Sequence, residues 1–129
     1  MTRPLLYLAH PIRRRTLADA ARLTQAIARA LELGWMPVAG WLLLRDHLND
    51  ANEDERAIAI ACDLSLLAAC NAFLVVGERV TEGMRHELDA WRSMNNHGRC
   101  DACSPRVAAW WEPEPFCLET LRRAPGGAA

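Results

Sequence analysis

Short, continuous runs of apolar residues alternate with longer segments of helical periodicity along this chain. The runs at 5–9 and 72–77 contain no polar alternation, which is typical of strands buried on both faces of a parallel sheet. The segments between and after them carry apolar residues three or four positions apart, as amphipathic helices do. Because parallel strands must be joined by crossover connections, this alternation predicts βαβ units and an α/β fold.

The first helical segment has clear boundaries. Thr16 and Asp19 have the spacing of a capping box, and Gly34 stands where this helix would end. Further elements are predicted as helices at 53–70 and 82–96, an apolar run at 36–44 that Pro37 and Gly40 interrupt, a strand at 107–111 and a short helix at 113–123. We therefore expect a flavodoxin- or Rossmann-like three-layer sandwich with a parallel sheet of four or five strands. A single domain would span residues 1–123, followed by a loose, disordered tail at 124–129.

Ligands of such sheets bind outside the carboxyl ends of the strands, where the strand order reverses. The segments to examine are therefore 10–15 and 77–82, which follow two of the expected strands. The second leads into Thr81-Glu82-Gly83, where a capping hydroxyl is followed by a glycine that permits close approach of a ligand. Helix N-termini carry free N–H groups and partial positive charge, so this turn favours a phosphate, a carboxylate or sugar hydroxyls.

Two acidic residues fall on the apolar faces of predicted helices. Glu87 follows Met84 by three residues and precedes Trp91 by four, so it shares their face. Asp63 lies beside the apolar stripe of the preceding helix, which consists of Ile60, Leu64 and Leu67. A buried acid costs several kcal/mol unless it is neutralised or used, which makes both residues candidates for a site. Structural ion pairs also place acids at the edges of elements, and this interpretation stays open for each residue alone.

The charge composition excludes several classes of function. All 15 basic side chains are arginine, so Schiff-base chemistry, lysine-anchored pyridoxal phosphate and a P-loop lysine are excluded. The net charge of −1 argues against a protein that binds a polynucleotide by neutralising its phosphates. No apolar run approaches the roughly 18 residues of a membrane span, and no signal-peptide pattern is present. We expect a cytoplasmic protein with reduced cysteines and no membrane contact.

Three motifs occur in a characteristic order along the chain. They are Tyr7-Leu8-Ala9-His10-Pro11, then Asp63-Leu64 ahead of Cys70-Asn71-Ala72, then Thr81-Glu82-Gly83-Met84-Arg85-His86-Glu87. In this order and spacing, the chain resembles the nucleoside 2-deoxyribosyltransferase-like superfamily, most closely its small uncharacterised bacterial and phage members. The resemblance runs from about Leu5 to Trp91, and its most specific element is the Thr81-x-Gly83-x-x-x-Glu87 pattern behind a hydrophobic strand.

The resemblance implies an enzyme that cleaves the N-glycosidic bond of a nucleoside or nucleotide. It places Glu87 as the nucleophile that attacks C1′ and Asp63 as the group that handles the base or its leaving nitrogen. It also places Tyr7 as the residue that orients the nucleophile. Thr81 stands where transferases carry an aspartate and nucleotide hydrolases carry a phosphate-binding serine, which favours a hydrolase of nucleoside monophosphates. No organic cofactor is implied, and the expected assembly is a homodimer or larger homo-oligomer.

The chemistry of glycosidic cleavage needs such a pair of acids. Its oxocarbenium-like transition state calls for one ionised carboxylate below C1′ and one proton donor near the departing group. A drier environment for Asp63 than for Glu87 would keep Asp63 protonated and separate the two roles.

Other residues near the expected site are candidates for substrate binding. They are His10, Arg13, Trp41, Thr81, Gly83 and Met84. Arg13-Arg14-Arg15 precedes a helix N-terminus, where an anion such as a 5′-phosphate would relieve the unfavourable charge. Three solvated loop arginines remain the alternative. Trp41 is either a base-stacking residue or a core residue, and His10 contacts either a ligand or the loop backbone.

A cysteine-containing segment after the third helix offers a competing feature. His97, Cys100, Cys103 and Cys117 have spacings that a structural zinc site could use. A lone CxxC without a second pair is weak evidence, so a redox pair and ordinary reduced cysteines are also open.

Two hypotheses of different classes follow from these observations. The first is an N-glycosidase or deoxyribosyltransferase-like enzyme with Glu87 as nucleophile. The second is a non-catalytic module that binds a nucleotide or sugar phosphate as a sensor or accessory protein.

Overall fold

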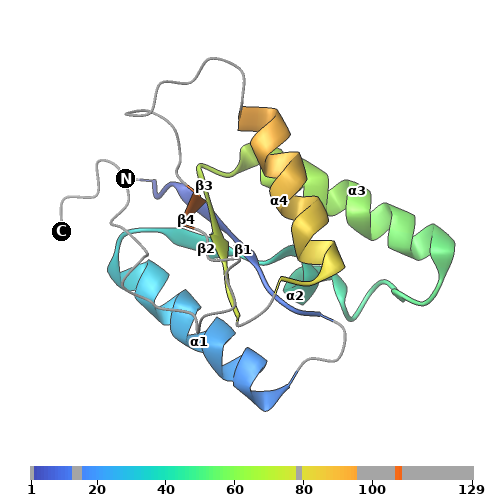
Figure 1. The fold of residues 1–129 in the computed structure, drawn as a ribbon, viewed down its shortest axis with the longest axis horizontal. Helices are drawn as coiled ribbons and strands as arrows, with labels where there is room; N and C mark the ends of the chain where they lie inside the picture. The colour runs from blue at the N-terminus through green and yellow to red at the C-terminus, as the bar shows by residue number, and fades with distance from the viewer. Residues whose placement is uncertain (1, 13–15, 78–79, 96–106, 109–129) are drawn as a thin grey trace.

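The computed structural model describes residues 2–12, 16–77, 80–95 and 107–108 and shows a mixed α/β fold around a parallel sheet (Figure 1). Its elements in chain order are β1 (Leu5–Ala9), α1 (Leu17–Glu32), β2 (Met36–Val38), α2 (Gly40–Leu44), α3 (Glu53–Ala69), β3 (Ala72–Val75), α4 (Glu82–Asn95) and β4 (Val107–Ala108). The strand order is β2-β1-β3-β4, and every neighbouring pair is parallel. Because β1 lies between β2 and β3, the chain leaves β1 toward one edge and later crosses back over it. The connections that leave the carboxyl ends of β1 and β3 therefore run to different sides of the sheet, and such sheets bind ligands between them.

The boundaries predicted for the first helix are confirmed in α1. Thr16 Oγ1 accepts a hydrogen bond from the Asp19 N–H at 3.0 Å, and Asp19 Oδ2 accepts one from the Thr16 N–H at 3.0 Å. This reciprocal pair satisfies two N–H groups that the first turn leaves free. Gly34, with φ of 92°, ends the helix in a conformation that side chains with a Cβ rarely adopt.

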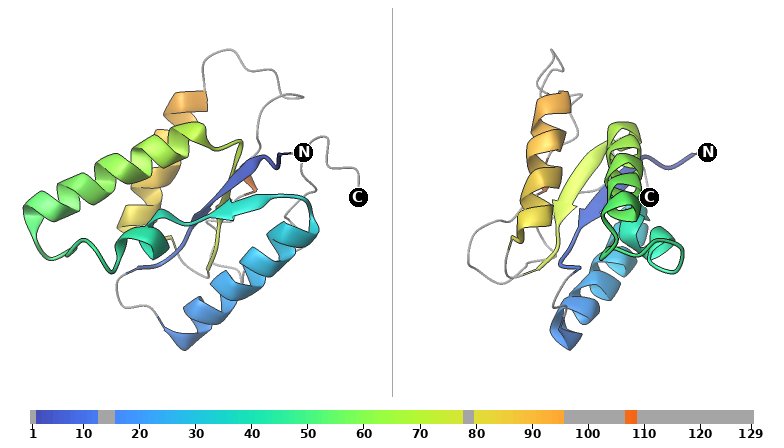
Figure 2. Two further views of the ribbon diagram at one scale, coloured as in Figure 1. Left: turned by 180° about the vertical axis from the view of Figure 1, so that it is seen from behind. Right: turned by 90° about the vertical axis from the view of Figure 1, so that its right-hand side faces the viewer.

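Helices pack against both faces of the sheet, because successive residues of β1 point in opposite directions. Leu6 and Leu8 face the core cluster that contains the buried residues of α1. Tyr7 and Ala9 face the other cluster, to which α3 and α4 contribute Leu67, Met84, Leu88 and Trp91. Figure 2 shows α1 and α4 on opposite sides of the strands. Glu87 and Asp63 belong to the helices on the Tyr7 side.

The apolar stripe predicted for α3 is confirmed at Leu67 and wrong at Ile60 and Leu64. Ile60 and Leu64 are 49% and 39% exposed, whereas Ala59 and Leu67 are buried and Asp63 lies between them on the same face. Apolar residues occur on nearly every side of this helix, so the periodicity did not define which side meets the sheet. Only the carboxyl-terminal part of α3 lies close to the strands, and its other end projects beyond them (Figure 2).

Two shorter elements also differ from expectation. The apolar run at 36–44 is divided into β2 and α2, since Pro37 and Gly40 separate an extended part from a helical one. The predicted strand at 107–111 is described only as Val107–Ala108, and the predicted helix at 113–123 and tail at 124–129 lie outside the described residues. Within the described ranges, no helix has both the length and the apolar character needed to cross a membrane.

Two glycines should respond oppositely to alanine. Gly34→Ala places a Cβ on a residue with positive φ and should lower the free energy of unfolding by about 1 kcal/mol. Gly83→Ala adds a methyl group in α4 where no atom lies within 4 Å, so helix propensity should raise the free energy of unfolding by up to about 1 kcal/mol. Urea unfolding followed by circular dichroism measures both, and equal effects of the two substitutions would contradict this account of the end of α1.

Candidate active site

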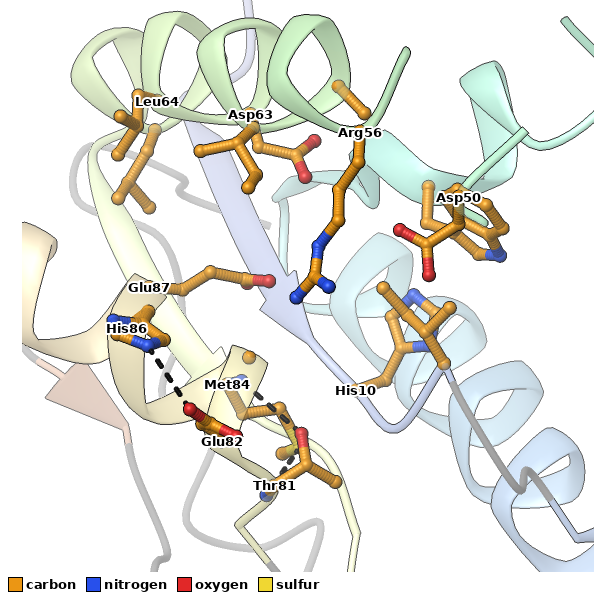
Figure 3. A pocket seen from close by; sticks show the side chains of 16 residues that line it. His10, Asp50, Arg56, Asp63, Leu64, Thr81, Glu82, Met84, His86 and Glu87 are labelled. Atoms are coloured by element: carbon orange, nitrogen blue, oxygen red, sulfur yellow. Dashed lines mark hydrogen bonds and ion pairs between the residues drawn. The ribbon is translucent and has the colours of Figure 1, made fainter. Parts of the chain in front are cut away.

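A cavity of about 480 Å³ lies at the carboxyl ends of β1 and β3. His10 and Ile12 line it after β1, and residues 81–84 line it where α4 begins after β3. The opposite wall is formed by α3, so side chains from both helices on the Tyr7 side project into the same space (Figure 3). Both segments singled out from the sequence, 10–15 and 77–82, contribute described residues to this cavity.

Glu87 enters the cavity from α4 and is half-buried. Burial, and to a smaller extent the negative charge of Asp63, raise the pKa of its carboxyl group to about 8. A hydrogen bond with the Tyr7 side chain acts in the opposite direction by favouring the ionised form. Within the helix, Met84, Leu88 and Trp91 are buried on the sheet side, as the spacing predicted, and they hold the helix in the orientation that aims Glu87 inward.

Asp63 enters the cavity from α3, opposite Glu87 (Figure 3). Its Oδ1 is buried, and it is the buried side-chain oxygen that has no hydrogen-bond partner in the described part of the chain. Burial raises the pKa of this carboxyl group to about 6. An unpartnered carboxyl oxygen in a dry place disfavours the charged form, so the environment of Asp63 favours the protonated acid.

Tyr7 lies beneath the two acids in the centre of β1. Its ring stacks on Phe73 of β3 with centroids 5.6 Å apart, and Phe73 in turn lies 5.9 Å from the ring of Trp91. Burial and the neighbouring charges of Glu87 and Asp63 raise the pKa of the Tyr7 hydroxyl well above its usual range. Tyr7 therefore remains a neutral phenol, and its hydrogen bond with Glu87 ties the acid on α4 to the central strand.

The negative charge of Asp63 raises the pKa of Glu87, so the titrations of the two carboxyl groups are linked. Glu87 has the higher pKa of the two, which reverses the expectation of a drier Asp63. The reason is tertiary: burial acts on both carboxyl groups, and Glu87 in addition faces the negative charge of Asp63 from α3. Between the two pKa values, Glu87 is the acid that holds its proton to higher pH.

Residues of the turn after β3 form the capped N-terminus of α4. Thr81 Oγ1 accepts a hydrogen bond from the Met84 N–H at 3.3 Å, as an N-cap hydroxyl does. Met84 is buried in the core and lines the bottom of the cavity, whereas Gly83 is exposed at its edge with open space around it. The close approach of a ligand to Gly83 therefore stays a prediction.

His10 and Trp41 also line the cavity, His10 buried and Trp41 half-buried. A ring nitrogen of His10 lies 3.3 Å from the carbonyl oxygen of Pro11, so the loop backbone already engages this histidine. Trp41 lies where a base could stack on it, and this role stays a prediction.

Arg56 is a cavity residue that the sequence analysis missed. Its guanidinium reaches from α3 into the space between Glu87 and His10 (Figure 3). Among the described residues that line the cavity, none forms an ion pair with it. The signal was available, because Arg56 precedes Asp63 by seven residues and two helical turns bring such residues to the same face.

Other predicted ligands fall outside the described residues. They are Arg13 of the arginine run and the zinc candidates His97, Cys100, Cys103 and Cys117. Across the ranges that the structure does describe, no group of three or more histidine, cysteine, aspartate or glutamate side chains could hold a metal ion.

Residues 4–100, more than half of the chain, match the family described as Domain of unknown function (DUF7768). The chain belongs to this family. A search of curated proteins finds no match. Because the description of DUF7768 names no activity, the function of this domain has to be argued from its cavity.

The raised pKa of Glu87 predicts how the free energy of unfolding depends on pH. A pKa raised from 4.5 to about 8 stabilises the fold fully below about pH 4.5, and this contribution is lost as the pH rises through 8. Glu87→Gln should therefore unfold like the parent at pH 5 but exceed its free energy of unfolding by roughly 2–4 kcal/mol at pH 9. Denaturant unfolding at a series of pH values measures the difference.

Glu82→Gln is the matched control, since Glu82 occupies the same helix with a side chain 93% exposed. This variant should follow the parent at every pH. A pH-independent difference between Glu87→Gln and the parent would contradict the burial of a titrating carboxyl group at residue 87.

Proposed function

We propose that this protein cleaves or transfers at the N-glycosidic bond of a nucleoside or nucleoside monophosphate, as the resemblance to nucleoside 2-deoxyribosyltransferase-like enzymes implies. The observation that carries the proposal is the pair of carboxyl groups, Glu87 and Asp63, that face one cavity with raised pKa values. Perturbed acids that converge in a cavity at the carboxyl ends of parallel strands are a strong indication of a catalytic site. Tyr7 supports it by holding Glu87 from below.

The reaction proceeds in two displacements at C1′. A Glu87 carboxylate oxygen bonds to C1′ while the bond from C1′ to the base nitrogen breaks and its electron pair goes to the base. Asp63 transfers its proton to the base as it departs. Water or a second base then attacks C1′, releases Glu87, and returns a proton to Asp63.

These two reaction steps need the pair of acids with one proton, which must be on Asp63 while Glu87 is ionised. Positive charge that develops at C1′ stabilises ionised Glu87, so a bound substrate favours moving the proton from Glu87 to Asp63. Below about pH 6 both acids are protonated and the nucleophile is lost, and above about pH 8 both are ionised and the acid is lost. The activity is therefore confined to the interval between these values.

The same proposal extends to the fold and the assembly. The order β2-β1-β3-β4 and the helices on both faces support a flavodoxin-like three-layer sandwich with four or five parallel strands. Exposed apolar residues on α3, among them Ile58, Ile60 and Leu64, support a homodimer or larger assembly. The cytoplasmic location stays a prediction.

Arg56 supports a phosphorylated substrate. An arginine that forms no ion pair with another described residue of the cavity, and that lies beside two acids, is suited to a charge-assisted, bidentate hydrogen bond with a phosphate. The hydrolase of nucleoside monophosphates is therefore favoured over the transferase of free nucleosides.

The alternative is a module that binds a nucleotide or sugar phosphate without turning it over. The pKa of Glu87 favours it, because an acid that is protonated at neutral pH serves a ligand as a hydrogen-bond donor rather than as a nucleophile. In that case a ligand binds in the cavity and leaves it unchanged.

Release of free base decides between the two. The purified protein is incubated with a panel of nucleosides and their 5′-monophosphates, and free base is measured by chromatography. We expect release by the parent with a maximum between about pH 6 and 8, and a loss of at least a thousandfold in Glu87→Ala. Unchanged release in the variant would remove Glu87 from the nucleophile role, and binding without release from any substrate would establish the binding module.

The role of Arg56 is tested with matched substrates. Arg56→Ala should raise KM for a monophosphate about tenfold or more, the equivalent of one lost charged contact, and leave KM for the corresponding nucleoside unchanged. Arg29→Ala is the control, because Arg29 pairs with Glu32 at 2.8 Å on α1 and takes no part in the cavity. An equal rise in KM for both substrates would show that Arg56 does not bind the phosphate.

A further inference from the structure

Gly40 occupies a position whose backbone does not require glycine. It is the first residue of α2 and is buried. The described glycines with positive φ are Gly34 and Gly77, so the backbone at Gly40 would accept any L residue. Alanine would be favoured there by helix propensity, and the reason for glycine must be spatial.

The space at Gly40 is filled by the side chain of Asp63. A Cβ built on Gly40 would overlap Asp63 Oδ1, lie 3.3 Å from Asp63 Cγ and lie 3.6 Å from Leu66 Cδ2. A side chain at residue 40 and the observed carboxyl group of Asp63 therefore exclude each other. This Oδ1 has no hydrogen-bond partner among the described residues. It can lie here because Gly40 has no side chain, and no hydrogen bond to a described residue fixes its position.

We propose that Gly40 is a positioning residue for Asp63: by leaving out a side chain, it admits the carboxyl group to a dry niche at the start of α2. The catalytic consequence rests on the proposed function, in which Asp63 must donate a proton. Asp63 lines the cavity, and only its Oδ1 occupies the niche. A methyl group at residue 40 displaces Oδ1 and turns the carboxyl group further into the cavity and its water, because rotation of this side chain is easier than movement of two helices.

The surroundings of Asp63 define what such a rotation changes. Glu87 faces it from α4, Tyr7 lies below it in β1, and Arg56 and His10 line the same cavity, whereas α2 contributes no titratable side chain. In the niche, burial dominates and keeps Asp63 protonated to higher pH. In the cavity, water and Arg56 stabilise the carboxylate, so Asp63 ionises at lower pH than it does in the niche.

The test is the titration of the Asp63 carboxyl carbon, followed by NMR in the full chain. We expect a midpoint near pH 6 in the parent, and an increase of at least tenfold in the acid dissociation constant in Gly40→Ala. Gly83→Ala is the matched control, because its added methyl group meets no atom within 4 Å and should leave this titration unchanged. An Asp63 titration in Gly40→Ala identical to that of the parent would overturn the proposal.

A double-mutant cycle covers the case in which Gly40→Ala disturbs folding. In the Asp63→Ala background the niche is empty, so Gly40→Ala should be tolerated there and the effects of the two substitutions on the unfolding midpoint should be strongly non-additive. Additive effects would show that residue 40 does not act through Asp63.

Activity adds a readout that separates this proposal from the proposed function. If the parent releases base, Gly40→Ala should move the acid limit of the pH profile, which Asp63 sets, to lower pH and reduce kcat with little change in KM. An unmoved acid limit would count against positioning. If the parent releases no base from any substrate, the glycosidase proposal fails, whereas the titration and the cycle still decide the role of Gly40.

Discussion

The structure depends on one strand whose side chains are buried in both directions. β1 pairs with β2 and β3 on its two edges, and Tyr7 stands opposite Val38 in one neighbour and Phe73 in the other. Alternate residues of β1 belong to different core clusters, so the strand couples α1 on one face to α3 and α4 on the other. The same strand delivers His10 to the cavity at its carboxyl end and Tyr7 to the base of the acidic pair. Fold and site are therefore built on the same five residues.

The cavity combines two acids with few groups that neutralise them. Ionised carboxylates in a dry environment are costly, and these two avoid part of the cost by holding protons to higher pH than free carboxyl groups do. Acids with such raised pKa values can hold and release protons near neutral pH, as catalytic groups do. The tyrosine below them favours the ionised form of Glu87, and the Arg56 guanidinium lies beside both acids in the same cavity.

Sequence periodicity predicted some elements closely and others poorly, for identifiable reasons. α1 was predicted to its ends, because Thr16, Asp19 and Gly34 are local signals that act within one turn of the helix. The buried side of α4 was predicted from Met84, Leu88 and Trp91, since polar residues separate them clearly. The buried side of α3 was predicted only at Leu67, because apolar residues surround the helix and only its packing in the tertiary structure selects Ala59 rather than Ile60.

The sequence by itself determined the βαβ alternation, the ends of α1 and the placing of Glu87 on a buried face, because these follow from short-range spacing and local hydrogen bonding. Only the tertiary structure decided which of the two acids is drier, that Arg56 enters the cavity, and that Gly40 and Asp63 occupy one space. Those outcomes depend on how closely helices distant in sequence approach one another. Burial and steric exclusion arise from that approach, and no pattern within a single segment encodes it.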